Sequence, residues 1–180
     1  LLTPAPEGPE ALALRRGELL HRLMAALAVL PPNERAQPGR RLLAAAGDFE
    51  EASREELLSE ALGVLAVPGL ADLFGPGSLA EVPLIGELED GTPVSGRIDR
   101  LAVLADRILI ADFKTDRRVP RDALSLPSAH VRQVALYARL LRLLYPDRRI
   151  EARLVYTAGP LSHALGADVL EGAVESVTSR

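Results

Sequence analysis

Two aliphatic runs separated by only two residues constrain this chain more than any other feature. The first extends over residues 94–104 and the second over residues 107–113. Such spacing is typical of a β-hairpin, although the intervening Ala-Asp is not a preferred turn dipeptide. With a two-residue turn, residues whose numbers sum to 211 face each other, so Asp99 lies opposite Asp112. Side chains alternate along a strand, so Asp112 and Lys114 project from one face.

Opposed carboxylates make this hairpin unusual. Directly opposite residues have Cβ atoms roughly 4.5–5.5 Å apart, and like charges at that distance are destabilising. A raised pKa, a nearby cation or a bound metal ion would relieve the repulsion. Lys114 supplies one positive charge, and a hard divalent cation would suit the carboxylate oxygens of Asp99 and Asp112. The alternative is a solvated face with a cross-strand ion pair.

Lys114 is the only lysine among the 21 basic residues, and the other twenty are arginines. Arginine stays protonated in proteins, whereas lysine is a compact charge whose pKa can be lowered. A site that needs lysine to position or activate a water molecule explains the exception. Chance placement of a single lysine is the competing explanation.

Composition narrows the class of protein. A length of 180 residues with 26% charged residues fits one soluble globular domain. The absence of cysteine excludes disulfides and a cysteine-ligated iron–sulfur cluster. No apolar run is long enough for a membrane span and no signal peptide is evident, so a cytoplasmic location is expected. The net charge is −4, but residues 97–142 hold ten basic and five acidic residues, which favours contact with phosphates there.

Four short motifs, in order, resemble the RecB-like branch of the PD-(D/E)xK nuclease superfamily. They are a G-x-x-x-H helix motif at 17–21, a G-R-I-D strand at 96–99, a D-F-K-T strand at 112–115 and a Q-x-x-x-Y helix motif at 133–137. The amino-acid sequence of residues 94–160 most resembles that of the C-terminal nuclease domain of proteobacterial AddA helicase-nucleases. The resemblance implies an α/β fold, with a restriction-endonuclease-like mixed sheet flanked by helices and an N-terminal helical segment.

The resemblance also implies a site. Its metal ligands for Mg²⁺ or Mn²⁺ would be His21, Asp99, Asp112 and the Phe113 carbonyl. The catalytic residues would be Asp99, Asp112, Lys114, Gln133 and Tyr137. In such relatives a glutamate in a comparable stretch lies close to the site, which makes Glu81, near the start of the first strand, a candidate for this position. An edge-strand charge is the alternative.

The expected partners follow from the same resemblance. They are DNA, presented as a single strand, fused helicase domains in a longer protein, and an AddB-type subunit, with double-strand-break repair as the setting. No P-loop motif is present, so ATP would be used only by the helicase part. A stand-alone RecB-like exonuclease and an inactive nuclease-fold DNA-binding module remain alternatives.

The remaining pattern predicts a linker at 1–9 followed by one domain at 10–180. Ser53 is a plausible first residue of a capping box and Ser128 a plausible N-cap. Gly96 inside a strand suggests close approach of another element. The expected elements are helices at 10–30, 33–46, 50–67, 128–145 and 167–177, strands at 78–87, 150–157 and 162–165, a helical turn at 70–74, and a loop at 120–127.

Overall fold

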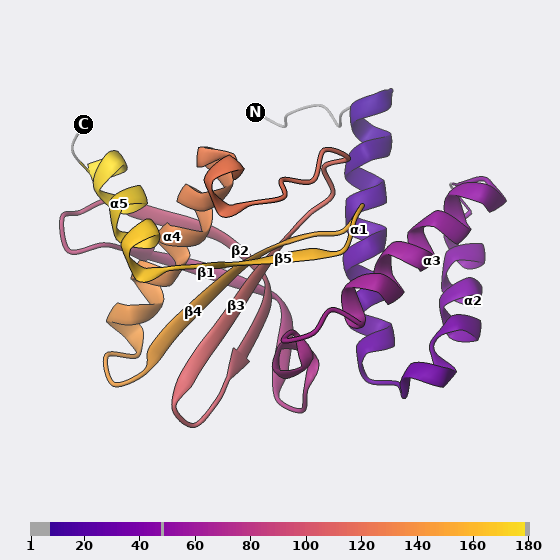
Figure 1. Ribbon diagram of the computed structural model, residues 1–180, viewed down its shortest axis with the longest axis horizontal. Coiled ribbons are helices and arrows are strands. Elements are labelled where there is room, and N and C mark those ends of the chain that lie inside the picture. The colour runs from indigo at the N-terminus through magenta and orange to yellow at the C-terminus, as the bar shows by residue number, and fades with distance from the viewer. Residues whose placement is uncertain (1–7, 48, 179–180) are drawn as a thin grey trace. The chain divides into compact units, whose positions relative to one another are not determined.

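A computed structural model describes residues 8–47 and 49–178, so residues 1–7 of the expected linker lie outside the described part. The chain forms two compact units, which divide between Ala66 and Val67. The first is helical and the second contains the sheet (Figure 1). Each is described separately below.

The helical unit contains α1 (Pro9–Ala28), α2 (Ala36–Ala46) and α3 (Glu51–Leu65), with a short 3₁₀ turn, η1 (Pro32–Glu34), before α2. Buried residues that recur at spacings of three or four give each helix one face toward the core of this unit. These faces supply fully or nearly fully buried side chains that include Leu20, Leu23, Leu27, Leu43 and Leu57. An ion pair between Arg16 and Glu60 also links α1 to α3.

The sheet unit is a five-stranded mixed sheet flanked by helices, as predicted. The strands follow chain order from edge to edge, and only β3 and β4 run parallel. The elements of this unit are η2 (Ala71–Phe74), β1 (Ser78–Glu87), β2 (Pro93–Val103), β3 (Arg107–Lys114), η3 (Ala123–Ser125), α4 (Ser128–Leu144), β4 (Arg149–Tyr156), β5 (Leu161–Leu165) and α5 (Ala167–Thr178).

Helix α4 connects the two parallel strands and packs across the sheet, with α5 beside it (Figure 1). A parallel connection needs such a crossover because the chain must return to the end of the sheet at which the first of the two strands began. Buried residues of α4 and the sheet form one apolar core, which includes Ile98, Ile110, Val134 and Leu154. On β3, Ile108 and Ile110 enter this core, so Asp112 and Lys114, at the same alternation, lie on the α4 side.

The short turn η2 packs against β2 and β3 through residues of the opposite alternation. The rings of Phe74 and Phe113 stack with centroids 6.3 Å apart and planes within 4°. The Arg100 guanidinium lies 5.1 Å from the centre of the Phe74 ring, and its Nε donates to the Leu73 carbonyl at 3.0 Å. Burial lowers the pKa of Arg100. Phe113 is thereby fixed from the side of the sheet that faces away from α4.

Two expected helix caps are wrong. The Glu50 carbonyl accepts from Arg54 N at 3.0 Å, so α3 begins before Ser53, which lies inside the helix and caps nothing. Similarly, the Pro127 carbonyl accepts from Val131 N at 3.2 Å, so Pro127 takes the N-cap position and Ser128 is the first helical residue.

Two further boundaries differ from the sequence prediction. The expected helix at 33–46 is divided into η1 and α2, and α1 begins at Pro9, inside the expected linker. Pro at the first position of a helix is favourable because its missing N–H needs no partner there. The expected loop at 120–127 contains the unpredicted 3₁₀ turn η3. The bounds of the other predicted helices and strands agree with the structure to within two residues.

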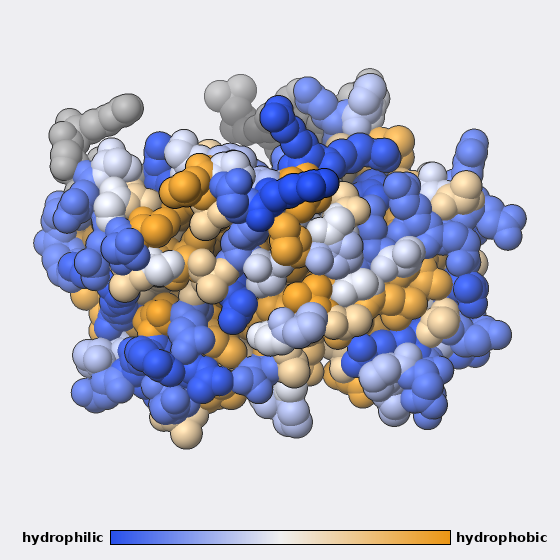
Figure 2. Space-filling view, in the orientation of Figure 1, coloured by the Kyte–Doolittle hydropathy of each residue, from blue (hydrophilic) through white to orange (hydrophobic). Residues whose placement is uncertain are grey.

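Hydrophilic residues cover much of the face shown in Figure 2, with apolar residues visible between them. One exposed apolar residue is Ile85 on the edge strand β1, which is 81% exposed. None of the described helices combines the length and the apolar character needed to cross a bilayer.

Two isoleucines on strands give a matched test of the sheet core. Ile110 is 1% exposed within the core and Ile85 is 81% exposed. Ile110→Ala should lower the free energy of unfolding by about 2–5 kcal/mol because it leaves a cavity. Ile85→Ala should change it by no more than about 0.5 kcal/mol. Urea unfolding of the full chain measures both, and equal losses would contradict the burial described here.

Candidate functional site

The β2–β3 hairpin has the predicted turn and the predicted register. Leu104 N donates to Arg107 O at 2.9 Å across the Ala-Asp turn. The observed pairs run from Val103 with Ile108 to Arg100 with Ala111, and the two residue numbers of each pair add up to 211, as predicted. The ladder ends at Arg100 and Ala111, immediately before the two aspartates. Those acidic positions therefore begin where regular pairing stops.

The Asp99 side chain replaces a ladder bond at this point. Its Oδ2 accepts a hydrogen bond from the backbone N–H of Phe113 at 2.6 Å. Phe113 lies between Asp112 and Lys114, so this bond fixes the Asp99 carboxylate against the segment that carries both other charged groups. A carboxylate held by a backbone donor has little rotational freedom and is favoured in its ionised form, which suits a metal ligand.

Asp112 and Lys114 form a buried ion pair. Lys114 Nζ lies 2.7 Å from Asp112 Oδ2, and the side chains are 15% and 6% exposed. The angles at this contact are not those of a hydrogen bond, and within the described part of the chain Asp112 Oδ2 accepts none. The short distance shows that the two charges compensate each other. The missing hydrogen bond shows that this buried oxygen retains a lone pair for another electropositive group.

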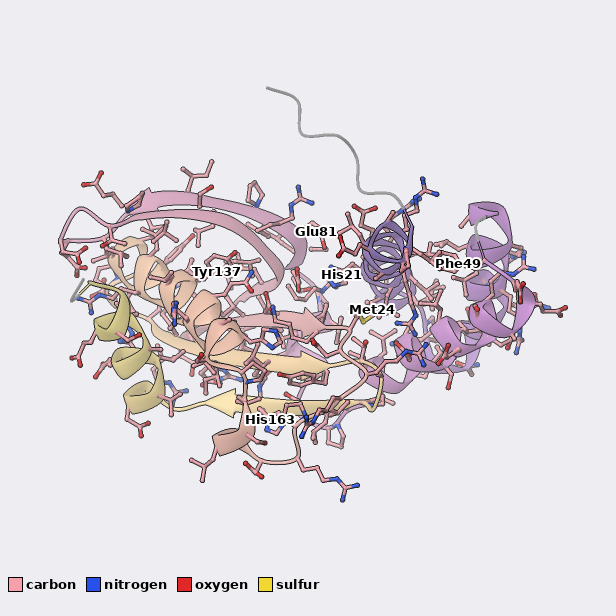
Figure 3. All side chains as sticks on the ribbon, turned by 90° about the horizontal axis from the view of Figure 1, so that it is seen from above. His21, Met24, Phe49, Glu81, Tyr137 and His163 are labelled. Carbon is pink, nitrogen blue, oxygen red and sulfur yellow. The ribbon has the colours of Figure 1, made fainter. Side chains whose placement is uncertain are left out.

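A hydrogen-bonded series leads from Lys114 to α4. Lys114 Nζ donates to Gln133 Oε1 at 2.8 Å, and Gln133 Nε2 donates to the Tyr137 hydroxyl at 3.2 Å. Gln133 and Tyr137 share a face of α4 because they are four residues apart. Tyr137 extends from α4 toward the sheet (Figure 3). Gln133 and Tyr137, the two helix residues expected to be catalytic, are thus connected to Lys114 by hydrogen bonds.

Gly96 makes room for this series. A Cβ atom built at Gly96 would overlap the Tyr137 hydroxyl. The close approach that a strand glycine suggested is therefore made by Tyr137, which is 6% exposed. Gly96 and Tyr137 together bring α4 onto β2 at the level of the acidic residues.

Glu81 lies beside Asp99. One carboxylate oxygen of each lies within 4.8 Å of the other, and Arg97 Nη1 forms an ion pair with Glu81 Oε2 at 3.1 Å. Glu81 also has a φ of 55°, a left-handed conformation that is uncommon for a residue with a side chain. Non-glycine residues in this region cluster at functional sites. The geometry favours proximity to the site over a simple edge-strand charge.

His21 lies on α1, in the helical unit, one turn after Gly17.

Arg117, Arg118 and Arg121 are exposed in the loop that follows β3. Within the described chain no carboxylate forms an ion pair with these three arginines, so their charges are available to an external anion.

Three residues without a distinguishing sequence motif, Thr157, Tyr156 and His130, lie near Lys114. Thr157 is fully buried and its backbone N–H donates to the Lys114 carbonyl at 3.0 Å. Tyr156 pairs with Lys114 in the parallel β3–β4 ladder, and its hydroxyl lies 3.1 Å from His130 Nδ1. The signal that could have found them is the strand–helix–strand order, which makes β4 parallel to β3 and aligns their ends.

The donor set fits a hard divalent cation. Carboxylate oxygens are the ligands that Mg²⁺ and related ions prefer, and two oxygens across such an ion are about 4 Å apart. The Glu81 and Asp99 oxygens lie within 4.8 Å of each other, which is close enough for one ion to contact both. Asp112 Oδ2 adds a buried oxygen with an unused lone pair. The residues of the sheet unit could therefore hold a cation, with Lys114 next to it.

Comparison with known proteins identifies the family. The chain matches no curated protein. A solved structure titled "Crystal structure of SSO0001" is similar at 15% identity and a TM-score of 0.37, over 94% of this chain and 86% of that chain. The family model described as the PD-(D/E)XK nuclease superfamily matches residues 2–175, nearly the whole sequence. The chain belongs to the PD-(D/E)XK nuclease superfamily.

Proposed function

We propose that this chain is a metal-dependent DNA exonuclease domain that hydrolyses phosphodiester bonds with Mg²⁺ or Mn²⁺. The observation that carries the proposal is the buried Asp112–Lys114 pair, with Asp99 bonded to the intervening Phe113. Superfamily membership supports a nuclease in general. The acidic oxygens and the lysine supply the groups that such hydrolysis needs.

Asp99, Asp112 and the Phe113 carbonyl are the proposed metal ligands, together with His21. The assignment of His21 rests on its place in the G-x-x-x-H pattern, since this residue belongs to the helical unit. A bound divalent ion supplies a more acidic water and positive charge at the scissile phosphate. Glu81, beside Asp99, adds negative charge that favours cation binding.

Lys114 is the proposed residue that orients the attacking water and offsets charge in the transition state. An ammonium has three N–H donors. One of them is given to Gln133 Oε1 at 2.8 Å. Asp112 Oδ2 lies 2.7 Å from the nitrogen without accepting a hydrogen bond, so Lys114 retains donor capacity for water or phosphate. Gln133 Nε2 donates to the Tyr137 hydroxyl, which fixes the orientation of the Gln133 amide. Gln133 and Tyr137 therefore act by fixing the orientation of the Lys114 ammonium.

The wider setting is proposed from the sequence resemblance alone. The similarity of residues 94–160 to AddA nuclease domains supports a module of a longer helicase-nuclease in double-strand-break repair. Its partners would be a single DNA strand delivered by the helicase and an AddB-type subunit, in the cytoplasm. The exposed Arg117, Arg118 and Arg121 support contact with the DNA backbone next to the site.

Cleavage of linear single-stranded DNA tests the proposal directly. Metal-dependent cleavage should fall about 10²–10⁴-fold in Lys114→Ala and Asp112→Ala. Lys114→Arg should fall similarly because a planar guanidinium does not fit between Asp112 and Gln133. Asp147→Ala, in the exposed turn before β4, is the matched control and should retain activity. Cleavage that survives EDTA, or both alanine variants, would refute the site.

Gly96→Ala tests the packing behind the lysine. The added methyl overlaps the Tyr137 hydroxyl, so it should displace the Tyr137–Gln133 series and cost about 1–3 kcal/mol of stability. Cleavage should fall at least about 10-fold at a temperature where the variant is fully folded. Unfolding curves and initial rates measure the two effects. A variant with unchanged rate would show that the series does not position Lys114.

Metal binding tests the ligand assignment without turnover. Mn²⁺ affinity, measured by electron paramagnetic resonance of the free ion, should fall at least about 10-fold in Asp99→Asn and in His21→Ala. Asp147→Asn removes the same charge from an exposed turn and should leave affinity unchanged. Unchanged affinity in His21→Ala alone would remove His21 from the ligand set and leave the carboxylates in place.

A further inference from the structure

A fully buried tyrosine lies next to Lys114. Tyr156 at the end of β4 is 0% exposed and is the parallel-ladder partner of Lys114. Burial raises the pKa of the Tyr156 phenol, and the charges of Asp116 and Asp112 raise it further. The phenol therefore keeps its proton and must find an acceptor for it.

His130 provides that acceptor. Its Nδ1 lies 3.1 Å from the Tyr156 hydroxyl, and within the described residues the hydroxyl has no other hydrogen-bond partner. A proton on Nδ1 would direct that N–H at the phenol oxygen and leave the buried phenol hydrogen without an acceptor, which is costly. The favourable arrangement has Tyr156 donating to a bare Nδ1. The imidazole proton then resides on Nε2.

The surroundings also keep His130 neutral. Burial and the Lys114 ammonium lower the pKa of His130, and the carboxylates of Asp116 and Asp112 oppose this only in part. A neutral imidazole with its proton on Nε2 is a hydrogen-bond donor that adds no charge next to Lys114.

The position of Tyr156 is fixed from its other side as well. The His163 ring meets the Tyr156 ring edge-on, with centroids 6.1 Å apart, and His163 Nε2 lies at hydrogen-bonding distance, 3.0 Å, from the Pro120 carbonyl. His163 is labelled on β5 in Figure 3. Tyr156 cannot easily swing away, so the His130 tautomer is fixed by a rigid neighbour.

His130 reaches the same region as the catalytic series. It precedes Gln133 by three residues on α4, so the two side chains share a helix face, and Gln133 binds Lys114. Unlike Tyr156, His130 is only partly buried. Arg117 and Arg118 lie exposed just beyond β3. A donor in this position is suited to an oxygen of an anionic ligand.

We propose that His130 binds a phosphate of the nucleic-acid strand beside the scissile bond, and that Tyr156 is a positioning residue that fixes the Nε2–H tautomer for this contact. This inference rests on the proposed nuclease function, because it assigns a further substrate-binding residue to the same site. It adds a neutral donor to the charged groups already described.

Nitrogen-15 NMR of the imidazoles tests the tautomer without substrate. The chain has 3 histidines, so His130 can be assigned by comparison with His130→Gln. The expected spectrum has a bare Nδ1 and a protonated Nε2. In Tyr156→Phe, which keeps the packing and removes only the hydroxyl, the Nδ1–H form should become populated. A wild-type His130 protonated on Nδ1 would overturn the role of Tyr156.

Binding of labelled single-stranded DNA in Ca²⁺, with uncleaved DNA verified on a gel, tests the phosphate contact. His130→Ala should raise the Kd for this DNA about 5-fold, which is the change in affinity expected for the loss of one hydrogen bond. His130→Gln, which retains an N–H donor, should recover part of that loss, and Tyr156→Phe should weaken binding to a smaller extent. Leu144→Ala, exposed at the far end of α4, is the control.

The two proposals fail in different ways. Equal DNA affinity in wild type and His130→Ala would overturn the phosphate contact, whether or not the chain cuts DNA. Wild-type protein that binds DNA in a His130-dependent manner but never cleaves with Mg²⁺ or Mn²⁺ would overturn the nuclease function and keep the contact.

Discussion

A single ion pair inside the sheet unit organises the rest of the site. Asp112 is a buried carboxylate, and such a group is tolerated only when a partner compensates its charge. Lys114, two residues further along β3, is that partner at 2.7 Å. Its nitrogen is in turn oriented by Gln133 of α4. The buried charge of Asp112 thus requires Lys114 on the same strand, and the Lys114 ammonium in turn requires a polar side chain such as Gln133 on α4.

Much of this arrangement was accessible from sequence. A two-residue turn between two aliphatic runs permits one register, and the structure has it from Val103 to Arg100. The bounds of β1, residues 78–87, also agree with the prediction. The lone lysine in an arginine-rich chain indicates a special role for position 114 because lysine and arginine differ in size and in acid–base behaviour. These features are local, so neighbouring residues are enough to predict them.

Other features depend on contacts between distant segments or on competing local signals. Ser53 fits the pattern of a cap and equally the interior of a helix, and the carbonyl of Glu50 decides between them. Tyr156 and His130 pack beside Lys114 only because α4 crosses over and makes β4 parallel to β3. Periodicity identifies each strand but not its partner, so this pair was not predicted. The left-handed backbone of Glu81 has no signature in sequence either.

The parallel pairing of β3 with β4 also determines when the site is complete during folding. The β2–β3 hairpin joins its strands through a short turn and can bring Asp99 and Asp112 together locally. The carbonyl of Lys114, by contrast, is held by Thr157, 43 residues away. Closing so long a segment costs more chain entropy than closing a turn. Any partly folded form that lacks β4 therefore has its acidic residues in register but leaves the backbone carbonyl of Lys114 without its partner.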